Sequence, residues 1–578
     1  MLGHTKHSLV SIVNKIAFAL LGFLVGSARA ITYNVIAEPP ANMSVAVVVD
    51  KVTYPLQATF GILYKGDAPS ATTEYHYAFV DNKDVKVSEP FTRPPLKDGL
   101  STTLNEFFNR SISTYEVNTL PQVLEPLSSI HRINSGLHNM NQIPSIHIYG
   151  NTSATKYLED NQSEDYKVKL NVAYIGLDSV QVFENVKVSL AGRSSRWIPK
   201  LSYGLKFDKK NDTTLFGFKN FKLRALARDS SYLRENLCYS SYRSIGAPAS
   251  GFSYVRLFID NKAVGLYGLI ETFQNPWAAA EFADGEKGYK AGYLYQGIGF
   301  SVTNAGVLKI SDLRYEGIDM ANYRVGQYKI KAGKHKKRIN AYQDLQEFTK
   351  FINESSVSTT PESEWEKKLD VDGFLRAMAI ENVLGLSDGY MPSANNFYLY
   401  RDPNQNNRFT YIAADMDSTL GNGIYLLDLM LSGNYSEHPG FSFRPLTRKI
   451  FSYPNYLNKY KEYILKFTQT LVNPSIMFPY IDSVVDMIRP EVEWDQSLRR
   501  VGKTVKDPYG SKNTEVLLNL VQSHSPPGLV ISFQNRTESF DVAINGPFRD
   551  DTRVNLKDFI IEKSSNVLAF YNQPNTYS

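Results

Sequence analysis

Cysteine is almost absent from this chain of 578 residues, since Cys238 is the only one. No disulfide can therefore form within the chain, and burial of apolar side chains must hold the fold together. We expect Cys238 itself to be a buried and unreactive side chain. A strong charge of either sign is also missing, because 63 Lys and Arg stand against 58 Asp and Glu. This balance argues against a nucleic-acid-binding protein and leaves a small molecule or another protein as the expected partner.

A long apolar run is missing from the N-terminal segment as well. Its run covers only residues 16–26, whereas a helix that crosses a bilayer needs about 20 residues. Lys6 and Lys15 precede the run, and Ser27-Ala-Arg-Ala30 follows it with the small-x-small pattern of a cleavage site. These features predict a signal peptide over residues 1–30, with an uncleaved anchor as the alternative. No transmembrane segment would remain after cleavage, so we expect a secreted or cell-surface protein.

Glycosylation signals agree with passage through the secretory pathway. The sequence holds eight Asn-x-Ser/Thr sequons whose middle residue is not proline, and they are spread along the whole chain. We expect them to be surface acceptors of a glycoprotein. The acceptor residues are Asn42, Asn109, Asn151, Asn161, Asn211, Asn353, Asn434 and Asn535.

The chain does contain ample apolar material, with 43% hydrophobic and 13% aromatic residues. This composition indicates folded globular domains rather than a disordered or fibrous chain. Short β-branched and aromatic runs at residues 31–36, 45–49 and 58–64 predict a small antiparallel β domain. With a polar, irregular connection that we interpret as a linker, this first region would occupy residues 31–140.

Residues 141–273 predict a mostly antiparallel sheet that carries one helix. The helix is expected over residues 232–245, started by Asp229 and stopped by Gly246. Alternation of apolar and polar residues marks the strands. The expected strands cover residues 186–190, 201–207, 221–226, 254–259 and 264–270.

Residues 274–578 are predicted to be mainly helical. Periodic segments at 341–352 and 371–386 predict helices, and the second is apolar on nearly every side, so we expect it to be buried. Two strands are expected at 397–400 and 409–414, followed by helix to about residue 524 and a short β ending. The complete pattern predicts an α+β fold.

The densest polar cluster in an apolar region gathers around the ends of these last strands. Asp388 follows the buried helix, Asn395 and Asn396 open one strand, and Asp415 and Asp417 close the next. Because strand side chains alternate, we expect Asp415 and Asp417 to point to the same face. Hard cations such as Mg²⁺ take oxygen ligands of this kind, often together with phosphate oxygens. The cluster therefore predicts a magnesium–nucleotide site, with helix caps and turns as the alternative interpretation.

Upstream residues offer possible phosphate contacts. The loop at Gly192-Arg-Ser-Ser195 could wrap phosphates with backbone N–H groups, although its sequence is not a P-loop. Lys222 shares a strand face with Arg224, and Glu235 on the following helix could pair with Lys222 over a nucleotide phosphate. The alternative for Lys222 and Arg224 is an exposed strand face.

The order of these motifs resembles the CotH kinase family, which includes secreted and surface proteins of mucoralean fungi. The resemblance covers residues 31–423, and the segments 31–36 and 101–110 look like the fungal members specifically. The motifs that carry it are Gly192-Arg-Ser-Ser-Arg196, Phe221-Lys-Leu-Arg224, Asp229-Ser-Ser-Tyr-Leu-Arg234, Val264-Gly-Leu-Tyr-Gly-Leu-Ile-Glu271, Asn395-Asn-Phe-Tyr-Leu-Tyr400 and Ala414-Asp-Met-Asp417.

The resemblance implies an atypical protein-kinase-like fold of two lobes, residues 141–273 forming the small lobe and 274–578 the large one. It implies ATP with Mg²⁺ or Mn²⁺ as cofactors and assigns roles residue by residue. Arg193 and Ser195 would lie in the phosphate-covering loop, Lys222 would hold the nucleotide, and Glu271 would lie near the hinge. Asp388 would be catalytic. The metal ligands would be Asn396, Asp415 and Asp417. Whether Asn395 or Asn396 binds metal, and whether Arg234 or Glu235 faces the cleft, stays open.

Three functions compete at this point. The first is a kinase that transfers the γ-phosphoryl group of ATP to Ser or Thr of a secreted or surface protein. The second is a surface adhesin or invasin that binds a host-cell receptor through a kinase-like scaffold without catalysis. The third interprets Asp415-x-Asp417 as the metal motif of a nucleotide-sugar transferase, which leaves Lys222 and Asp388 without a role.

Overall fold

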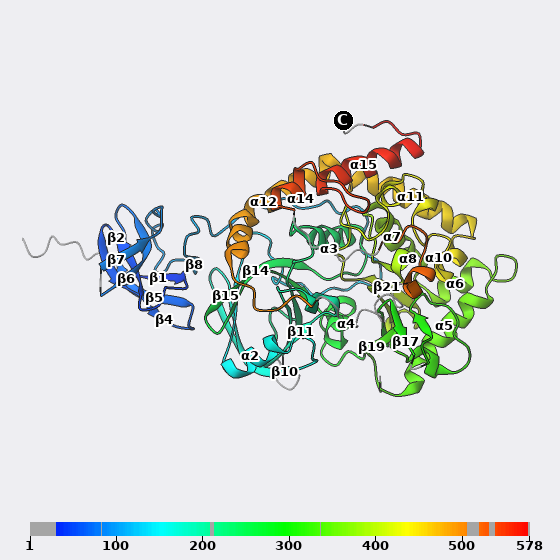
Figure 1. The fold of residues 1–578 in the computed structure, drawn as a ribbon, viewed down its shortest axis with the longest axis horizontal. Coiled ribbons are helices and arrows are strands. Elements are labelled where there is room, and N and C mark those ends of the chain that lie inside the picture. The colour runs from blue at the N-terminus through cyan, green and yellow to red at the C-terminus, as the bar shows by residue number, and fades with distance from the viewer. Residues whose placement is uncertain are drawn as a thin grey trace, which may run out of the picture. The chain divides into compact units, whose positions relative to one another are not determined.

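The computed structural model describes residues 30–82, 84–207, 213–303, 305–335, 337–505, 519–530 and 538–575. The predicted signal peptide, apart from Ala30, and the sequons at Asn211 and Asn535 lie outside the described residues. The chain divides into two compact units (Figure 1). The first comprises residues 1–114 with the short segments 173–181 and 260–263, and the second comprises the remainder.

The first unit is built from two four-stranded sheets, as its alternating sequence predicts. One sheet has the order β4-β5-β1-β8 and the other β3-β2-β6-β7. Tyr33, Val45, Val47 and Tyr77 are fully buried in its core. The strands are β1 (Ala30–Ile36), β2 (Ser44–Val49), β3 (Val52–Pro55), β4 (Gln57–Ala58), β5 (Leu63–Pro69), β6 (Tyr75–Asp81), β7 (Asp84–Ser88) and β8 (Glu106–Phe107).

Two details of the first unit differ from the sequence prediction. The run 58–64 is not one strand, because the chain bends between β4 and β5, where Gly61 has a φ of +78°. Strand β8 also pairs in parallel with β1, so the first unit is not wholly antiparallel.

The first sheet of the second unit is a closed seven-stranded barrel. The sequence had predicted a sheet without closure. The strand order of the barrel is β10-β11-β12-β13-β15-β14-β9. Closure depends on a parallel pairing between β9 and β14, in which Ile146 lies opposite Leu257. A helix that was not predicted, α2 (Thr152–Asp160), follows β9. The strands are β9 (Ser145–Tyr149), β10 (Lys167–Ile175), β11 (Val180–Ala191), β12 (Ser202–Lys206), β13 (Asn220–Arg224), β14 (Phe252–Ile259) and β15 (Lys262–Glu271).

Helix α3 (Arg234–Ser244) carries the predicted helix of this region. It begins two residues later than expected, because the Asp229 carboxylate accepts the backbone N–H of Arg234 at 2.8 Å. It ends before Gly246, whose φ is +67°, a conformation that glycine adopts without strain. Cys238 on this helix is fully buried, as predicted.

The chain after Glu271 contains more β-structure than the sequence predicted. A four-stranded sheet has the order β19-β16-β20-β21, and only its last two strands were expected. Its strands are β16 (Leu294–Gly297), β19 (Tyr328–Ala332), β20 (Phe397–Arg401) and β21 (Phe409–Ala413), and the hairpin β17 (Phe300–Val302) and β18 (Leu308–Ile310) lies apart.

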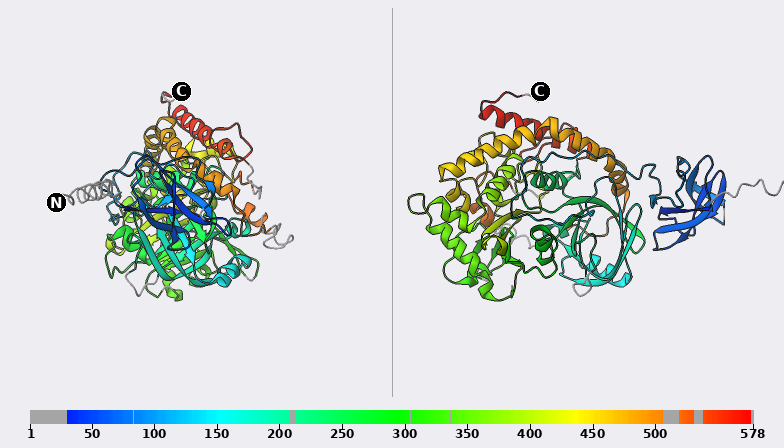
Figure 2. Two further views of the ribbon diagram at one scale, coloured as in Figure 1. Left: turned by 90° about the vertical axis from the view of Figure 1, so that its left-hand side faces the viewer. Right: turned by 180° about the vertical axis from the view of Figure 1, so that it is seen from behind.

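Helices make up most of the remaining second unit. The elongated helices α11, α12 and α15 lie side by side along one margin of this unit (Figures 1 and 2). The short β ending was wrong, because residues 538–575 form α14 and α15 instead. Within the described residues, no helix is long and apolar enough to cross a membrane. The helices are α4 (Asn275–Phe282), α5 (Gln343–Glu354), α6 (Glu362–Lys368), α7 (Val371–Val383), α8 (Tyr390–Ser393), α9 (Leu427–Leu431), α10 (Pro445–Ile450), α11 (Pro454–Thr470), α12 (Pro474–Ser497), α14 (Phe540–Asn545) and α15 (Leu556–Phe570).

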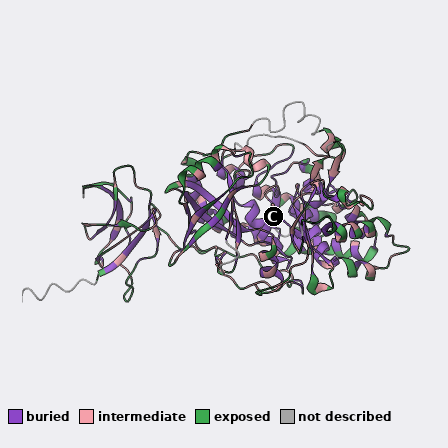
Figure 3. Ribbon diagram, turned by 90° about the horizontal axis from the view of Figure 1, so that it is seen from below, coloured by how far each residue is buried: buried purple, intermediate pink, exposed green. Residues whose placement is uncertain are grey.

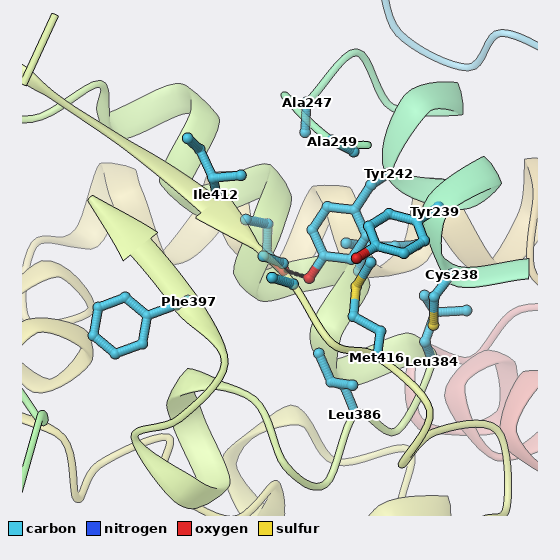
Figure 4. Packing of buried hydrophobic residues seen from close by; sticks show 14 of the residues in the cluster. Cys238, Tyr239, Tyr242, Ala247, Ala249, Leu384, Leu386, Phe397, Ile412 and Met416 are labelled. Carbon is cyan, nitrogen blue, oxygen red and sulfur yellow. Dashed lines mark hydrogen bonds between the residues drawn. The ribbon is translucent and has the colours of Figure 1, made fainter. Parts of the chain in front are cut away.

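The core of the second unit lies where α3, α7 and the segment after β21 meet. Buried residues follow the strands and inner helices (Figure 3). Tyr239 and Tyr242 of α3 pack beside Met416 and Leu384 (Figure 4). The Tyr242 hydroxyl also donates to the carbonyl of Ala377 on α7, at 3.4 Å. The core therefore fixes α3 against the segment that holds Asp415 and Asp417.

Candidate functional site

Strand β13 brings two cations to one acidic residue. Lys222 and Arg224 are two positions apart, so their side chains leave the same face of the strand. The Lys222 amine lies 3.3 Å from Oδ2 of Asp415, and Nη1 of Arg224 contacts Oδ1 of the same carboxylate. The structure therefore joins the predicted nucleotide-holding lysine to the predicted metal ligand, across 193 positions of sequence.

Arg224 is the centre of this cluster. Its Nε donates to Oε2 of Glu235 at 2.6 Å, and its Nη2 donates to Oδ2 of Asp417 at 3.0 Å. Only 7% of the Arg224 side chain is exposed, so the alternative of an exposed strand face is wrong for this residue. The ion pair that we considered between Lys222 and Glu235 is not formed; Glu235 pairs with Arg224 instead. Arg234, by contrast, pairs with Asp229 at 2.6 Å, so Glu235 is the residue that faces the cluster.

Asp415 and Asp417 converge for a reason other than strand alternation. Strand β21 ends at Ala413, and Asp415 has a left-handed φ of +54°. Met416 between them is fully buried and packs against α3 (Figure 4). Both neighbouring carboxylates then reach Arg224. Asp415 stays partly accessible, with 37% of its side chain exposed.

Asp388 lies in the turn between α7 and α8, where two amides hold its carboxylate. Asn395 donates from Nδ2 to Oδ1 at 3.1 Å, and Asn396 donates from Nδ2 to Oδ2 at 2.8 Å. Burial, together with the charges of Asp417 and Asp415, raises the pKa of Asp388 to about 7 against the effect of these two hydrogen bonds. A carboxyl group with this pKa can accept a proton near neutral pH.

The pKa values of the acidic side chains in the cluster are shifted in opposite directions. Burial, with the charges of Asp415 and Asp417, raises the pKa of Glu235 to about 7 against the effect of Arg224. The pKa of Asp415 moves the other way, because Arg224 and Lys222 outweigh its burial. Asp388 and Glu235 thus have pKa values near neutrality, mainly because they are buried and partly because the charges of Asp415 and Asp417 lie near them. A divalent cation would relieve this repulsion.

The donor chemistry fits such a cation, although the cluster is not a preformed metal cage. Among the described residues, no three His, Cys, Asp or Glu side chains are grouped as a metal centre. The oxygens of Asp415, Asp417 and Asn396 are the hard donors that Mg²⁺ or Mn²⁺ prefers, usually with water and phosphate oxygens completing the shell. In the structure the Asp415 oxygens contact Lys222 and Arg224, so a metal ion would share them with these cations.

The predicted phosphate-covering loop is a tight turn at the end of β11. Gly192 has a φ of +85°, and a Cβ atom there would lie 1.8 Å from Oγ of Ser195. Ser195 donates this hydroxyl to the Ala191 carbonyl at 3.4 Å, and Arg193 is exposed and donates to the Ile298 carbonyl at 3.2 Å. Neither side chain contacts the cluster around Arg224.

Arg228, which was not predicted as a site residue, links this loop to the cluster. It donates from Nη2 to the Ser194 carbonyl at 3.2 Å, and its charge contributes to the lowered pKa of Asp415. Its Nε is buried and has no hydrogen-bond partner among the described residues. No local pattern in the sequence marks this residue, because its contacts come from distant segments.

Glu271 is not part of the cluster. It lies directly opposite Phe221 on the neighbouring strand, so its side chain shares the face of Phe221 and not that of Lys222. The carboxylate is buried among donors: Arg132 at 3.1 Å, Trp277 Nε1 at 2.7 Å and His138 Nε2 at 3.1 Å. Arg132 and His138 lower its pKa against its burial. The side chain of Glu271 therefore anchors residues 132–138 to the barrel.

Comparison with known proteins shows the family of the chain. The profile of the family described as CotH kinase protein matches residues 188–514, more than half of the chain. The chain is 25% identical to invasin CotH3 of Rhizopus delemar over 527 residues, which covers 89% of this chain and 83% of that protein. It is 26% identical to spore coat protein homolog 1 of the same organism, covering 87% and 78%, and 24% identical to invasin CotH2, covering 87% and 81%. With Lys222, Arg224, Asp388 and Asp415 all inside the matched region, the chain belongs to the CotH kinase family.

Proposed function

We propose that this chain is a metal-dependent protein kinase that transfers the γ-phosphoryl group of ATP to Ser or Thr of a secreted or surface protein. One observation carries the proposal: Asp388, held by two amides, lies close enough to Asp415 for the charge of that carboxylate to raise its pKa, and Asp415 is paired with Lys222. Phosphoryl transfer needs little covalent chemistry from a protein. Positioning and charge stabilisation supply most of the rate, and this cluster offers both.

Each residue has a distinct part in the proposed reaction. Asp388 orients the substrate hydroxyl and accepts its proton, since its carboxylate is fixed by Asn395 and Asn396. Asp415, Asp417 and Asn396 hold Mg²⁺ or Mn²⁺, which neutralises phosphate charge when it is bound. Asn396 is preferred over Asn395 as the metal ligand. It immediately precedes β20, and its side-chain amide donates to both the backbone carbonyl and the carboxylate of Asp388.

The cations orient the nucleotide. Lys222 is placed to leave Asp415 for a phosphate oxygen, since its side chain is only 15% exposed and, among the described residues, it forms an ion pair with Asp415 alone. Arg224 keeps Glu235 and Asp417 in place and so supports α3 against β13. Arg228, with its unpartnered Nε, extends the cationic surface from Asp415 to the loop at Gly192. In this proposal, Arg193 and Ser195 are parts of the phosphate-covering loop, and Glu271 is a residue of the hinge.

The proposal divides the chain as the sequence suggested. Residues 1–30 are a signal peptide, 31–140 a β domain with its linker, 141–273 the small lobe and 274–578 the large lobe of a two-lobed kinase-like fold. The mature protein is secreted or displayed at the cell surface, where the predicted sequons would be glycosylated. The names of the relatives, spore coat protein homolog and invasin, support a surface location.

A second function is favoured by a specific finding. Two of the compared relatives are named invasins, so the chain could instead act as a surface protein that binds a host-cell receptor. In that case the Arg224 cluster would only stabilise the fold, as a network of ion pairs. The charged groups around Arg224 that could form this network are Lys222, Glu235, Asp415 and Asp417. The two functions differ in one respect: an adhesin does not need Asp388 to accept a proton.

Transfer of radiolabelled phosphate distinguishes them. Purified mature protein would be incubated with ATP, Mg²⁺ or Mn²⁺ and a mixture of Ser- and Thr-containing substrate proteins. We expect wild-type transfer and a loss of at least about a hundredfold in Asp388→Asn, which keeps the shape of the carboxylate but removes the base. Asp372→Asn, which changes a carboxylate on α7 outside the cluster, serves as the matched control and should retain activity. Equal activity of Asp388→Asn and wild type, or no wild-type transfer, would favour the invasin-like function.

A further inference from the structure

The turn that carries Asp388 has an unusual backbone. It leads through the short helix α8 to Asn395 and Asn396, whose amides donate to the Asp388 carboxylate. The conformation of this one segment of nine residues, 388–396, therefore sets the positions of all three side chains. Ala394 and Asn396 in this segment have left-handed φ values of +49° and +54°. Such conformations are costly for residues other than glycine and persist only where surrounding contacts enforce them. The structure shows which contacts do so.

Glu381 of α7 supports the turn from inside the protein. It is fully buried, and its Oε1 accepts the backbone N–H of Met391 at 2.7 Å. The carboxyl group also lies directly against Gly389, where a Cβ atom would come within 2.8 Å of it. Gly389 has a φ of −85°, which any residue can adopt, so the absence of a side chain there serves this close approach.

Arg444 supports the same turn from another side. Its buried side chain donates from Nε to the Met391 carbonyl at 2.8 Å and from Nη2 to the Pro392 carbonyl. The Tyr425 hydroxyl donates to the Pro392 carbonyl as well, at 2.6 Å. The N–H of Met391 and the carbonyls of Met391 and Pro392 are therefore all held by side chains from other segments, which leaves the turn little freedom to shift.

We propose that Glu381 and Arg444 are positioning residues that hold the turn of residues 388–396 in the one conformation in which Asp388 meets Asn395 and Asn396. The catalytic consequence rests on the proposed kinase function, but the structural consequence does not. Neither residue would touch ATP, metal or substrate, because both are buried and act through backbone atoms. Nucleotide binding should therefore be insensitive to their replacement, whereas the rate of transfer should depend on them.

The protonation state of Glu381 decides which substitutions keep its hydrogen bond to Met391 and which remove it. Burial raises its pKa to about 8, against the opposing effects of the Met391 N–H and Arg444. At neutral pH its role is thus that of a neutral hydrogen-bond acceptor, which glutamine reproduces with nearly the same shape. Leucine has a similar volume but leaves the Met391 N–H buried without a partner.

Two measurements on full-length mature protein test the proposal. The first is amide hydrogen exchange of residues 388–396, which does not require activity. We expect wild type and Glu381→Gln to be equally protected, and Glu381→Leu to exchange at least roughly tenfold faster in this segment alone, since an unsatisfied buried N–H is costly. Ile544→Ala in α14, a cavity variant outside the turn, controls for general destabilisation. Unchanged protection of 388–396 in Glu381→Leu, or a loss spread evenly over the protein, would overturn the proposal.

The second measurement separates kcat from nucleotide affinity. Glu381→Leu and Arg444→Lys should lower kcat at least roughly tenfold with the Kd for ATP within about twofold, because small misplacements of a catalytic group are expensive. Should Glu381→Leu not fold, Gly389→Ala tests the same contact from the turn, and it should lower kcat in the same way. A normal kcat in these variants contradicts the proposal. Absence of transfer in wild type contradicts the kinase function instead, and hydrogen exchange alone then decides whether the two residues hold the turn.

Discussion

Arg224 and Glu235 form a buried ion pair, with 2.6 Å between Nε and Oε2, that fastens helix α3 to strand β13. The exposed fractions of the two side chains are 7% and 2%. Because the same guanidinium also holds Asp415 and Asp417, one residue connects the barrel, the helix and the segment after β21. Its removal would leave three acidic groups without their principal cation.

Arg224→Met should therefore destabilise the protein far more than loss of an exposed ion pair would. Breaking a buried pair by removing one partner costs about 3–5 kcal/mol. The free energy of unfolding, measured with urea, tests this value. Lys156→Met, which removes a solvent-exposed pair with Asp160, is the matched control and should leave the free energy of unfolding almost unchanged. Similar small effects of both variants would mean that the cluster does not support the fold.

Lys563 predicts an unusual dependence of stability on pH. Its amine is fully buried, donates to the Ser432 carbonyl at 2.8 Å, and has its pKa lowered by burial to about 7. The unfolded chain, with a lysine pKa near 10.4, binds more protons than the folded one between about pH 7 and pH 10. The free energy of unfolding should therefore rise with pH across this window.

Comparison with Lys563→Met isolates that effect. The wild type should gain stability relative to the variant, on the order of 3–5 kcal/mol between pH 7 and pH 10. Urea unfolding at both pH values measures the difference, and other titrating groups cancel because they are present in both proteins. A difference that is constant with pH would show that the lysine is solvated or paired in the folded protein.

Gly192 should be irreplaceable in the loop between β11 and β12. An alanine there would have a strained φ of +85° and a Cβ atom 1.8 Å from Ser195 Oγ, so the Ser195 hydroxyl must move away as well. If this loop covers the phosphates, Gly192→Ala should raise the Kd for ATP at least roughly tenfold, as loss of a good hydrogen bond to a charged group does. Gly288→Ala is the control, because Gly288 has a similar φ of +87° with no described atom within 4 Å of a Cβ. Equal affinities of both variants would exclude the loop from the nucleotide site.

Cys238 should resist thiol reagents in the native protein. Burial raises the pKa of its thiol to about 12, so almost no thiolate exists at neutral pH. We expect an aromatic disulfide reagent to modify it only after denaturant is added. Modification within seconds under native conditions would show that α3 detaches from its neighbours, and would contradict the fixed position of Glu235.

The sequence predicted those features that local patterns encode. Alternation marked the barrel strands around Lys222, and an apolar helix marked α7, because both depend on residues close in sequence. Closure of the barrel could not be predicted, since it needs Ile146 to pair with Leu257 more than a hundred positions away. Strands β16 and β19 were missed because they are short, and the lysines of β19 are typical of an exposed segment.

The same distinction holds for the candidate site. The density of polar residues was enough to group Asp388, Asn396 and Asp415, although the reason given for the convergence of Asp415 and Asp417 was wrong. The partners of these residues were less accessible to sequence reasoning. Arg224 rather than Lys222 pairs with Glu235, and Arg228 reaches Ser194 across 34 positions. Such contacts arise from tertiary packing, which no local pattern records.

Metal-dependent binding of ATP tests the account most directly. Calorimetry on purified mature protein would compare wild type with Asp415→Ala, in the presence and in the absence of Mg²⁺ or Mn²⁺. We predict that wild type binds ATP only with the metal and that Asp415→Ala loses this binding while its unfolding transition is retained. Asp388→Asn should bind as wild type does, because its carboxylate acts on the substrate hydroxyl. Metal-independent binding, or equal affinity of Asp415→Ala and wild type, would contradict the proposed site.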